Sequence, residues 1–133
     1  MAMEHVGYVT KNLLGMVDFY CKYFGGTASH WTEDGTDYEL YFISFPGGGS
    51  RLELQKCQSD LPDGINNQGA VGLAHVAFQV ETKQELHELT DRMVADGVKL
   101  RTPPTAYGTE FYESSVFDPD GNIVEIAVNQ KNL

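Results

Sequence analysis

Cysteine and basic residues are scarce in this chain of 133 residues. The two cysteines, Cys21 and Cys57, have no CxxC spacing and are too few for a disulfide framework, which fits a reducing compartment. Nine Lys and Arg stand against nineteen Asp and Glu, and the formal net charge is −10. An excess of this sign repels phosphate backbones and anionic membrane surfaces. We therefore expect neither nucleic acid nor a membrane as a partner.

Long apolar runs are also absent. No stretch has the length needed to cross a bilayer, and residues 1–15 contain no continuous apolar segment behind a basic start. These two absences predict a cytoplasmic protein. Hydrophobic residues make up 41% of the chain and charged residues 21%, as in an average globular domain. The length suits one ordinary domain, so we expect a single domain over residues 1–133.

The first half of the chain has the periodicity of a β-α-β-β-β unit. A strand pattern at residues 4–9 precedes apolar residues at helical spacing, and Gly25 and Gly26 end this helix. Further strand patterns, separated by glycine-rich turns, lie at residues 27–32, 38–45 and 51–55.

The second half repeats this order. Residues 73–80 predict a strand, and Thr82 with Glu85 forms the capping box of a helix that Gly97 closes. The apolar stripe expected on this helix consists of Leu86, Leu89, Met93 and Val94. Three more strands are predicted at residues 98–101, 110–117 and 123–128. Residues 103–108 are predicted to form a loop, either a pocket lid or a plain surface connection.

The fold class predicted from this order is α+β, with two tandem βαβββ modules. The modules cover about residues 3–57 and 73–129, and a connector rich in polar residues and glycine covers residues 58–72. His5 and His75 are 70 residues apart, while Glu53 and Glu125, each between two apolar residues, are 72 apart. This near-constant offset indicates an internal duplication.

Side chains alternate between the two faces of a strand, which assigns neighbours to each of these four residues. In every strand, one face is bulky and apolar, and the other carries a single ligand-type side chain. A small residue leaves space on that second face in three of the strands, namely Gly7, Ala77 and Ala127. The pattern is typical of strands that line a cavity.

The His and Glu residues have a plain interpretation when each is taken alone. A lone His in a strand is more often structural than a ligand, and a lone Glu usually faces solvent. As a set, however, they can converge on one point, and half-buried carboxylates are unfavourable without a cation. We therefore predict that His5, Glu53, His75 and Glu125 bind one divalent metal ion. Two nitrogens and two oxygens suit Ni, Co or Zn first, and also Mn or Fe.

Further motifs accompany these four residues: Asp18-Phe19-Tyr20, Phe24-Gly25, His75-Val76-Ala77-Phe78 and Asp118-Pro119-Asp120-Gly121-Asn122. With them the chain resembles, from Glu4 to Asn129, the vicinal oxygen chelate (glyoxalase/bleomycin resistance/dioxygenase) superfamily. Within that superfamily it is most similar to glyoxalase I, also called lactoylglutathione lyase. The order His, Glu, His, Glu favours this type, since extradiol dioxygenases and fosfomycin-modifying thiol transferases use two His and one Glu.

The resemblance implies a cupped mixed sheet wrapped around the metal site, and a homodimer. It also implies a small-molecule substrate, the hemithioacetal of a 2-oxoaldehyde and a thiol, with proton transfer between neighbouring carbons through an enediolate. Glu125 is the first choice for the base and Glu53 the second. These two glutamates are thus the catalytic candidates.

Two positions depart from the glutathione-using relatives. Those relatives carry an Arg four residues beyond the first His and an Asn four residues beyond the first Glu, where this chain has Val9 and Cys57. These residues therefore leave the identity of the thiol cosubstrate open. The alternatives are a fosfomycin-type thiol transferase or a dioxygenase of the same superfamily, and a bleomycin-resistance-like module that binds a small molecule without catalysis.

Overall fold

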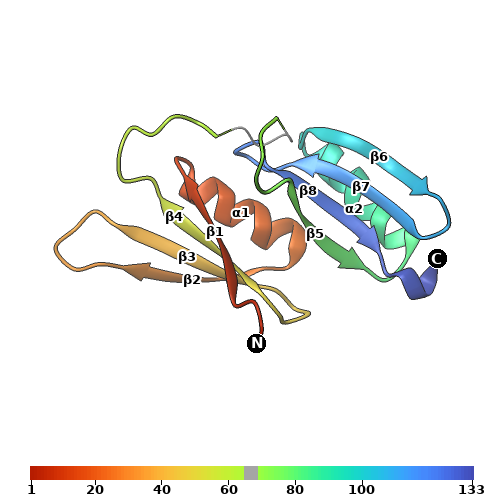
Figure 1. Ribbon diagram of the computed structural model, residues 1–133, viewed down its shortest axis with the longest axis horizontal. Coiled ribbons are helices and arrows are strands. Elements are labelled where there is room, and N and C mark those ends of the chain that lie inside the picture. The colour runs from red at the N-terminus through yellow and green to blue at the C-terminus, as the bar shows by residue number, and fades with distance from the viewer. Residues whose placement is uncertain (65–68) are drawn as a thin grey trace. The chain divides into compact units, whose positions relative to one another are not determined.

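The computed structural model of the protein describes residues 1–64 and 69–133. It divides into two compact units, residues 1–63 and 64–133, and the division falls inside the predicted connector. Residues 65–68 of that connector lie outside the described residues. Each unit contains one helix of at least twelve residues and one four-stranded mixed sheet (Figure 1). The predicted fold class, α+β with two tandem βαβββ modules, is confirmed.

The first module forms a sheet with the order β1-β4-β3-β2. Its strands are β1 (His5–Thr10), β2 (Thr27–Thr32), β3 (Glu39–Ser44) and β4 (Arg51–Lys56). β1 and β4 pair in parallel, and the other two pairs are antiparallel. The first and last strands of the module are therefore neighbours.

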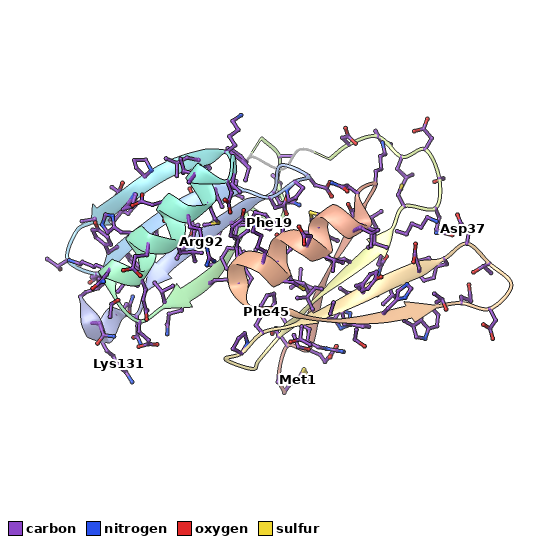
Figure 2. The ribbon with its side chains drawn as sticks, turned by 180° about the vertical axis from the view of Figure 1, so that it is seen from behind. Met1, Phe19, Asp37, Phe45, Arg92 and Lys131 are labelled. Carbon is purple, nitrogen blue, oxygen red and sulfur yellow. The ribbon has the colours of Figure 1, made fainter. Side chains whose placement is uncertain are left out.

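Helix α1 (Leu13–Phe24) packs against β2, β3 and β4. The Asn12 side chain accepts a hydrogen bond from Gly15 N at 3.2 Å and caps the first turn. Gly25 ends the helix with a positive φ of 67°, a conformation that suits glycine. One face of the helix is buried, and it consists of Leu13, Met16, Phe19, Tyr20, Tyr23 and Phe24. Figure 2, which labels Phe19, shows the helix in front of its sheet.

The second module has the equivalent sheet order, β5-β8-β7-β6. Its strands are β5 (His75–Val80), β6 (Leu100–Tyr107), β7 (Phe111–Phe117) and β8 (Ile123–Val128), and a short 3-10 helix follows at Gln130–Asn132. β5 and β8 pair in parallel, as β1 and β4 do. The duplication inferred from the His and Glu offsets therefore extends to strand order and direction.

Helix α2 (Lys83–Ala95) begins with the predicted capping box: Glu85 N donates to Thr82 Oγ1 at 3.1 Å, and Thr82 N donates to Glu85 Oε2 at 3.2 Å. Val94 was expected in the apolar stripe but is 45% exposed. Thr90 takes a core position instead, because its hydroxyl bonds to Leu86 O at 2.7 Å and is therefore satisfied when buried.

The prediction of a loop at residues 103–108 is wrong for most of these residues, because residues 103–107 belong to a strand. β6 continues to Tyr107 and pairs with β7 through register shifts between Leu100 and Thr105. β6 is an edge strand of its sheet, where Pro103 and Pro104 remove no hydrogen bond from an inner ladder. The prolines were thus compatible with a strand, and no lid is present at this position in the described residues.

The two faces of each sheet differ as the alternation predicted. On β4, Leu52 and Leu54 are buried, whereas Arg51, Glu53 and Gln55 are half-buried on the other face. β8 shows the same pattern, because its even-numbered residues are all buried and Glu125 and Ala127 are half-buried. Within the described residues, no helix has the length and hydropathy of a transmembrane span.

Candidate metal centre

His5 and Glu53 lie together on neighbouring strands of the first module. Because β1 and β4 run in parallel, Gly7 is the register partner of Glu53 and His5 that of Arg51. His5 Nε2 is 3.0 Å from Glu53 Oε2. A Cβ at Gly7 would lie 3.6 Å from the same oxygen, so the glycine keeps the space beside the carboxylate open. The first two predicted ligands are therefore brought together.

Glu53 is the more buried partner, with 12% of its side chain exposed against 39% for His5. Its second oxygen accepts a hydrogen bond from Gln55 Nε2 at 3.1 Å. Phe42 on β3 is the register partner of Glu53, and the His5 ring packs on it edge-on with centroids 5.4 Å apart. Both oxygens of Glu53 and the plane of the His5 ring are thus held by neighbouring side chains.

The second module repeats this pair. His75 Nε2 is 3.2 Å from Glu125 Oε2, and Ala77 is the register partner of Glu125, as Gly7 is of Glu53. Glu125 is again the more buried residue, with 17% of its side chain exposed. The other two predicted ligands are therefore also brought together.

Two residues of β7 lie on the same face, and the sequence reasoning missed both. Ser115 is the register partner of Glu125, and Glu113 that of Ala127. Burial raises the pKa of the Glu113 carboxyl, and the nearby Glu125 carboxylate raises it further, while His75 lowers it. Alternation along residues 113–117 placed these two side chains on one face, but only the β7–β8 register shows that they face Glu125.

Ser115 is buried, and its hydroxyl has no hydrogen-bond partner among the described residues. Buried polar atoms are almost always paired, so this hydroxyl, opposite the Glu125 carboxylate, is available for a hydrogen bond to a further group. β7 therefore places Ser115 and Glu113 opposite Glu125 and Ala127, where β3 places Phe42 and Leu40 opposite Glu53 and Gln55.

The donor chemistry of both pairs fits a divalent ion. Two ligand atoms bound at right angles about 2.1 Å from one ion would lie about 3 Å apart. The distances of 3.0 and 3.2 Å between imidazole nitrogen and carboxylate oxygen agree with this spacing. Within the described residues, no three or more His, Cys, Asp or Glu side chains are gathered into a metal-binding group. Each module brings together one His–Glu pair of the predicted ligand set.

The remaining histidines lie outside these pairs. His30 Nε2 is 2.8 Å from Glu39 Oε2, and its ring stacks on Tyr41 with centroids 4.4 Å apart. His87 Nε2 is 2.9 Å from the Tyr112 hydroxyl. Both are exposed and already have protein partners, so neither extends the ligand set.

Val9 and Cys57, the positions that depart from the glutathione-using pattern, have different surroundings. Val9 is 55% exposed on the same face of β1 as His5. Cys57 follows the end of β4 and lines a cavity of about 450 Å³ with residues at the start of α1. Its thiol donates to Ser59 O at 2.8 Å.

Duplicated βαβββ modules, each with a His–Glu pair across its parallel strands, define the class of this protein. The chain belongs to the Glyoxalase/Bleomycin resistance protein/Dioxygenase superfamily, whose family profile matches residues 2–126. The resemblance to this superfamily that the sequence motifs indicated is confirmed.

Similar proteins in this superfamily have different activities. The chain is 28% identical over 126 residues to biphenyl-2,3-diol 1,2-dioxygenase 2 of Rhodococcus globerulus, covering 94% of this chain and 61% of that one. It thus spans about three fifths of the length of that curated relative. The structure of lactoylglutathione lyase from Agrobacterium tumefaciens is 25% identical with a TM-score of 0.69, covering 98% of this chain and 95% of the other.

A third similar structure is a variant of the fosfomycin resistance protein FosX from Listeria monocytogenes, complexed with Mn(II) and a dihydroxypropylphosphonic acid. It is 18% identical with a TM-score of 0.72, and the match covers 96% of this chain and 92% of that one. At this identity the likeness concerns the fold.

Proposed function

We propose that the protein is a metal-dependent lyase or isomerase of the glyoxalase I type. Its substrate is the hemithioacetal formed from a 2-oxoaldehyde and a thiol. The observation that carries this proposal is the repeated pair: His5 with Glu53 at 3.0 Å, and His75 with Glu125 at 3.2 Å. The similarity to a lactoylglutathione lyase at 25% identity supports the same reaction type.

In this proposal the four side chains are ligands of one divalent ion, with Ni, Co or Zn favoured over Mn or Fe. The Mn(II) complex of FosX supports the use of divalent ions on this fold. When bound, the ion supplies Lewis acidity that stabilises a developing oxyanion of the substrate.

Glu125 is the proposed base. It takes the proton from the carbon that bears sulfur and returns it to the neighbouring carbon, while the hydroxyl proton passes to the former carbonyl oxygen. The product, a thioester with a neighbouring hydroxyl group, is an isomer of the hemithioacetal. Gln55 holds the second oxygen of Glu53 at 3.1 Å, whereas Glu125 faces Glu113 and the unpaired Ser115 hydroxyl. These surroundings favour Glu125 over Glu53 for proton transfer.

The thiol is proposed to be one other than glutathione, or one bound with little discrimination. Val9 is uncharged and Cys57 already donates to a backbone carbonyl. Neither side chain can replace a charged or amide group in holding a peptide carboxylate.

A homodimer in the cytoplasm completes the proposal. Each sheet has two edge strands, β1 and β2 in the first module and β5 and β6 in the second. Exposed edges favour pairing with another strand or chain. Sedimentation at micromolar concentration should give the mass of a dimer, and a single monomer peak would contradict this part of the proposal.

Metal analysis followed by an activity assay tests the whole proposal. Protein purified without added metal is analysed for divalent ions, reloaded with each candidate, and incubated with methylglyoxal and several thiols. We expect conversion of the hemithioacetal to its thioester. The dioxygenase relative makes ring cleavage of a catechol with Fe(II) and oxygen the second candidate. Catechol cleavage or fosfomycin modification without thioester formation would contradict the glyoxalase assignment, and ligand binding without metal or turnover would favour the binding module.

A further inference from the structure

A second carboxylate contacts His5 on the side of the ring away from Glu53. Glu4 Oε2 is hydrogen-bonded to His5 Nδ1, while His5 Nε2 lies 3.0 Å from Glu53 Oε2. A carboxylate accepts hydrogen bonds, so Nδ1 is the donor in the contact with Glu4. Nε2 faces the Glu53 carboxylate in the same way, so a metal ion bound at Nε2 would replace a proton there while Nδ1 keeps its proton.

Glu4 is itself held in place by Arg51. Arg51 Nε donates to Glu4 Oε1 at 2.7 Å, and Nη2 of the same guanidinium forms an ion pair with that oxygen. Arg51 N also donates to Glu4 O at 2.9 Å, which fixes the backbone of Glu4 next to β4. Contacts from Arg51 to both the side chain and the backbone of Glu4 therefore fix its carboxylate beside Nδ1.

Phe42 contacts both partners of Glu4. The Arg51 guanidinium lies 3.9 Å from the centroid of the Phe42 ring, and the His5 ring packs on the same residue edge-on. A cation over an aromatic face is attracted to it, so Phe42 orients Arg51 as well as His5. The chain of contacts therefore runs from Phe42 through Arg51 and Glu4 to His5 Nδ1.

Among the residues that the structure describes, the second module has no equivalent of this arrangement. Ala74 precedes His75, and Ile123 is its register partner where His5 has Arg51. Because the two modules otherwise match, the contacts of Glu4 belong to the first module rather than to the βαβββ unit in general.

We propose that Glu4, held by Arg51, is a positioning residue that keeps Nδ1 of His5 protonated and Nε2 available as the metal ligand. This inference rests on the metal site of the proposed function. It makes His5 a pre-oriented ligand. Carboxylates that orient a ligating histidine typically change metal affinity by about 10-fold to 100-fold.

The test combines the ring protonation of His5 in the Zn²⁺-loaded protein with metal affinity. Nitrogen-15 NMR should show the His5 proton on Nδ1 and the metal on Nε2. Glu4→Leu should remove this preference and weaken Zn²⁺ binding by about 10-fold to 100-fold, as measured by competition with a chelator. Glu4→Gln, which retains an acceptor without the charge, should give an intermediate loss. Glu110→Leu changes the charge equally at an exposed position and should leave both measurements unchanged.

The outcomes separate this inference from the proposed function. A proton on Nε2 of His5 in the unmodified chain, or unchanged Zn²⁺ affinity in Glu4→Leu, overturns the role of Glu4 while the metal site stands. If the Nδ1 proton depends on Glu4 but the chain binds none of the candidate ions, the proposed metal site is wrong. Glu4 then has no metal ligand to position. Glu4 has 59% of its side chain exposed, and thermal unfolding of each variant will verify that the fold is retained.

Discussion

Ser114 and Ser115 are adjacent on β7, both are buried, and they differ in hydrogen bonding. Ser114 Oγ lies 2.8 Å from Thr90 Oγ1 on the helix side of the sheet. Ser115 Oγ, on the other side, has no partner among the residues that the structure describes. One strand therefore presents a satisfied hydroxyl to the core and an unsatisfied hydroxyl to the candidate centre.

This difference predicts opposite effects of the same substitution. Ser115→Ala removes an unpaired buried hydroxyl and should raise the free energy of unfolding by up to about 1 kcal/mol. Ser114→Ala removes a partner of Thr90 and should lower it by about 1 kcal/mol. Urea denaturation of both variants measures the two changes. An equal loss in both would mean that Ser115 Oγ has a partner in solution.

The ligand set predicts one metal ion per chain that depends on both modules. Glu53→Gln and His75→Ala alter different modules, and each should weaken metal binding by at least about tenfold. His30→Ala disrupts a His–Glu pair outside the set and serves as the matched control. Metal content and chelator competition are the measurements. Two ions per chain, with one retained in each variant, would contradict a shared centre.

Glu113 predicts a pH-dependent change in the stability of the metal-free protein. Its folded-state pKa lies above the ordinary value of 4.5, first because of burial and second because of Glu125. A carboxyl with a raised pKa favours the folded state when protonated, and that contribution is lost as the pH rises through the folded-state pKa. Glu113→Gln should therefore stabilise the protein near neutral pH, and the gain should vanish below pH 4.5. Thermal unfolding across this range, with the exposed Glu110→Gln as control, will show whether the gain follows the pH.

The thiol preference can be altered at the two departing positions. Each missing charge-assisted hydrogen bond to a carboxylate costs about 1.5–3 kcal/mol, or roughly tenfold to more than a hundredfold in transition-state binding. Val9→Arg combined with Cys57→Asn should raise kcat/KM for the glutathione adduct more than for a small-thiol adduct. High efficiency with the glutathione adduct in the unmodified chain would show that other residues recognise this thiol.

Most of the fold follows from local signals in the sequence. Gly25 and the Thr82 capping box predict helix boundaries because they satisfy backbone groups within a few residues. β6 was harder to predict, since Pro103 and Pro104 are compatible with a strand only at an edge, and edge position is a property of the whole sheet.

For the candidate site, the sequence predicts which side chains share a face, and the single metal ion bound by all four stays a prediction. Period-two alternation and duplication predict which His and Glu share a face, and the structure pairs His5 with Glu53 and His75 with Glu125. The roles of Glu4 and Ser115 depend on cross-strand register, which a single sequence does not reveal.

The parallel pairing of β1 with β4, and of β5 with β8, has a consequence for the order of events in the cell. His5 and Glu53 are separated by 48 residues and His75 and Glu125 by 50, so each pair closes a loop that contains the rest of its module. Such long-range contacts form late in folding because the entropy of loop closure opposes them. A nascent or partly folded chain therefore presents scattered single donors rather than a binding pair. If the proposed metal site is correct, metal binding follows folding, and unfinished chains compete poorly for scarce ions.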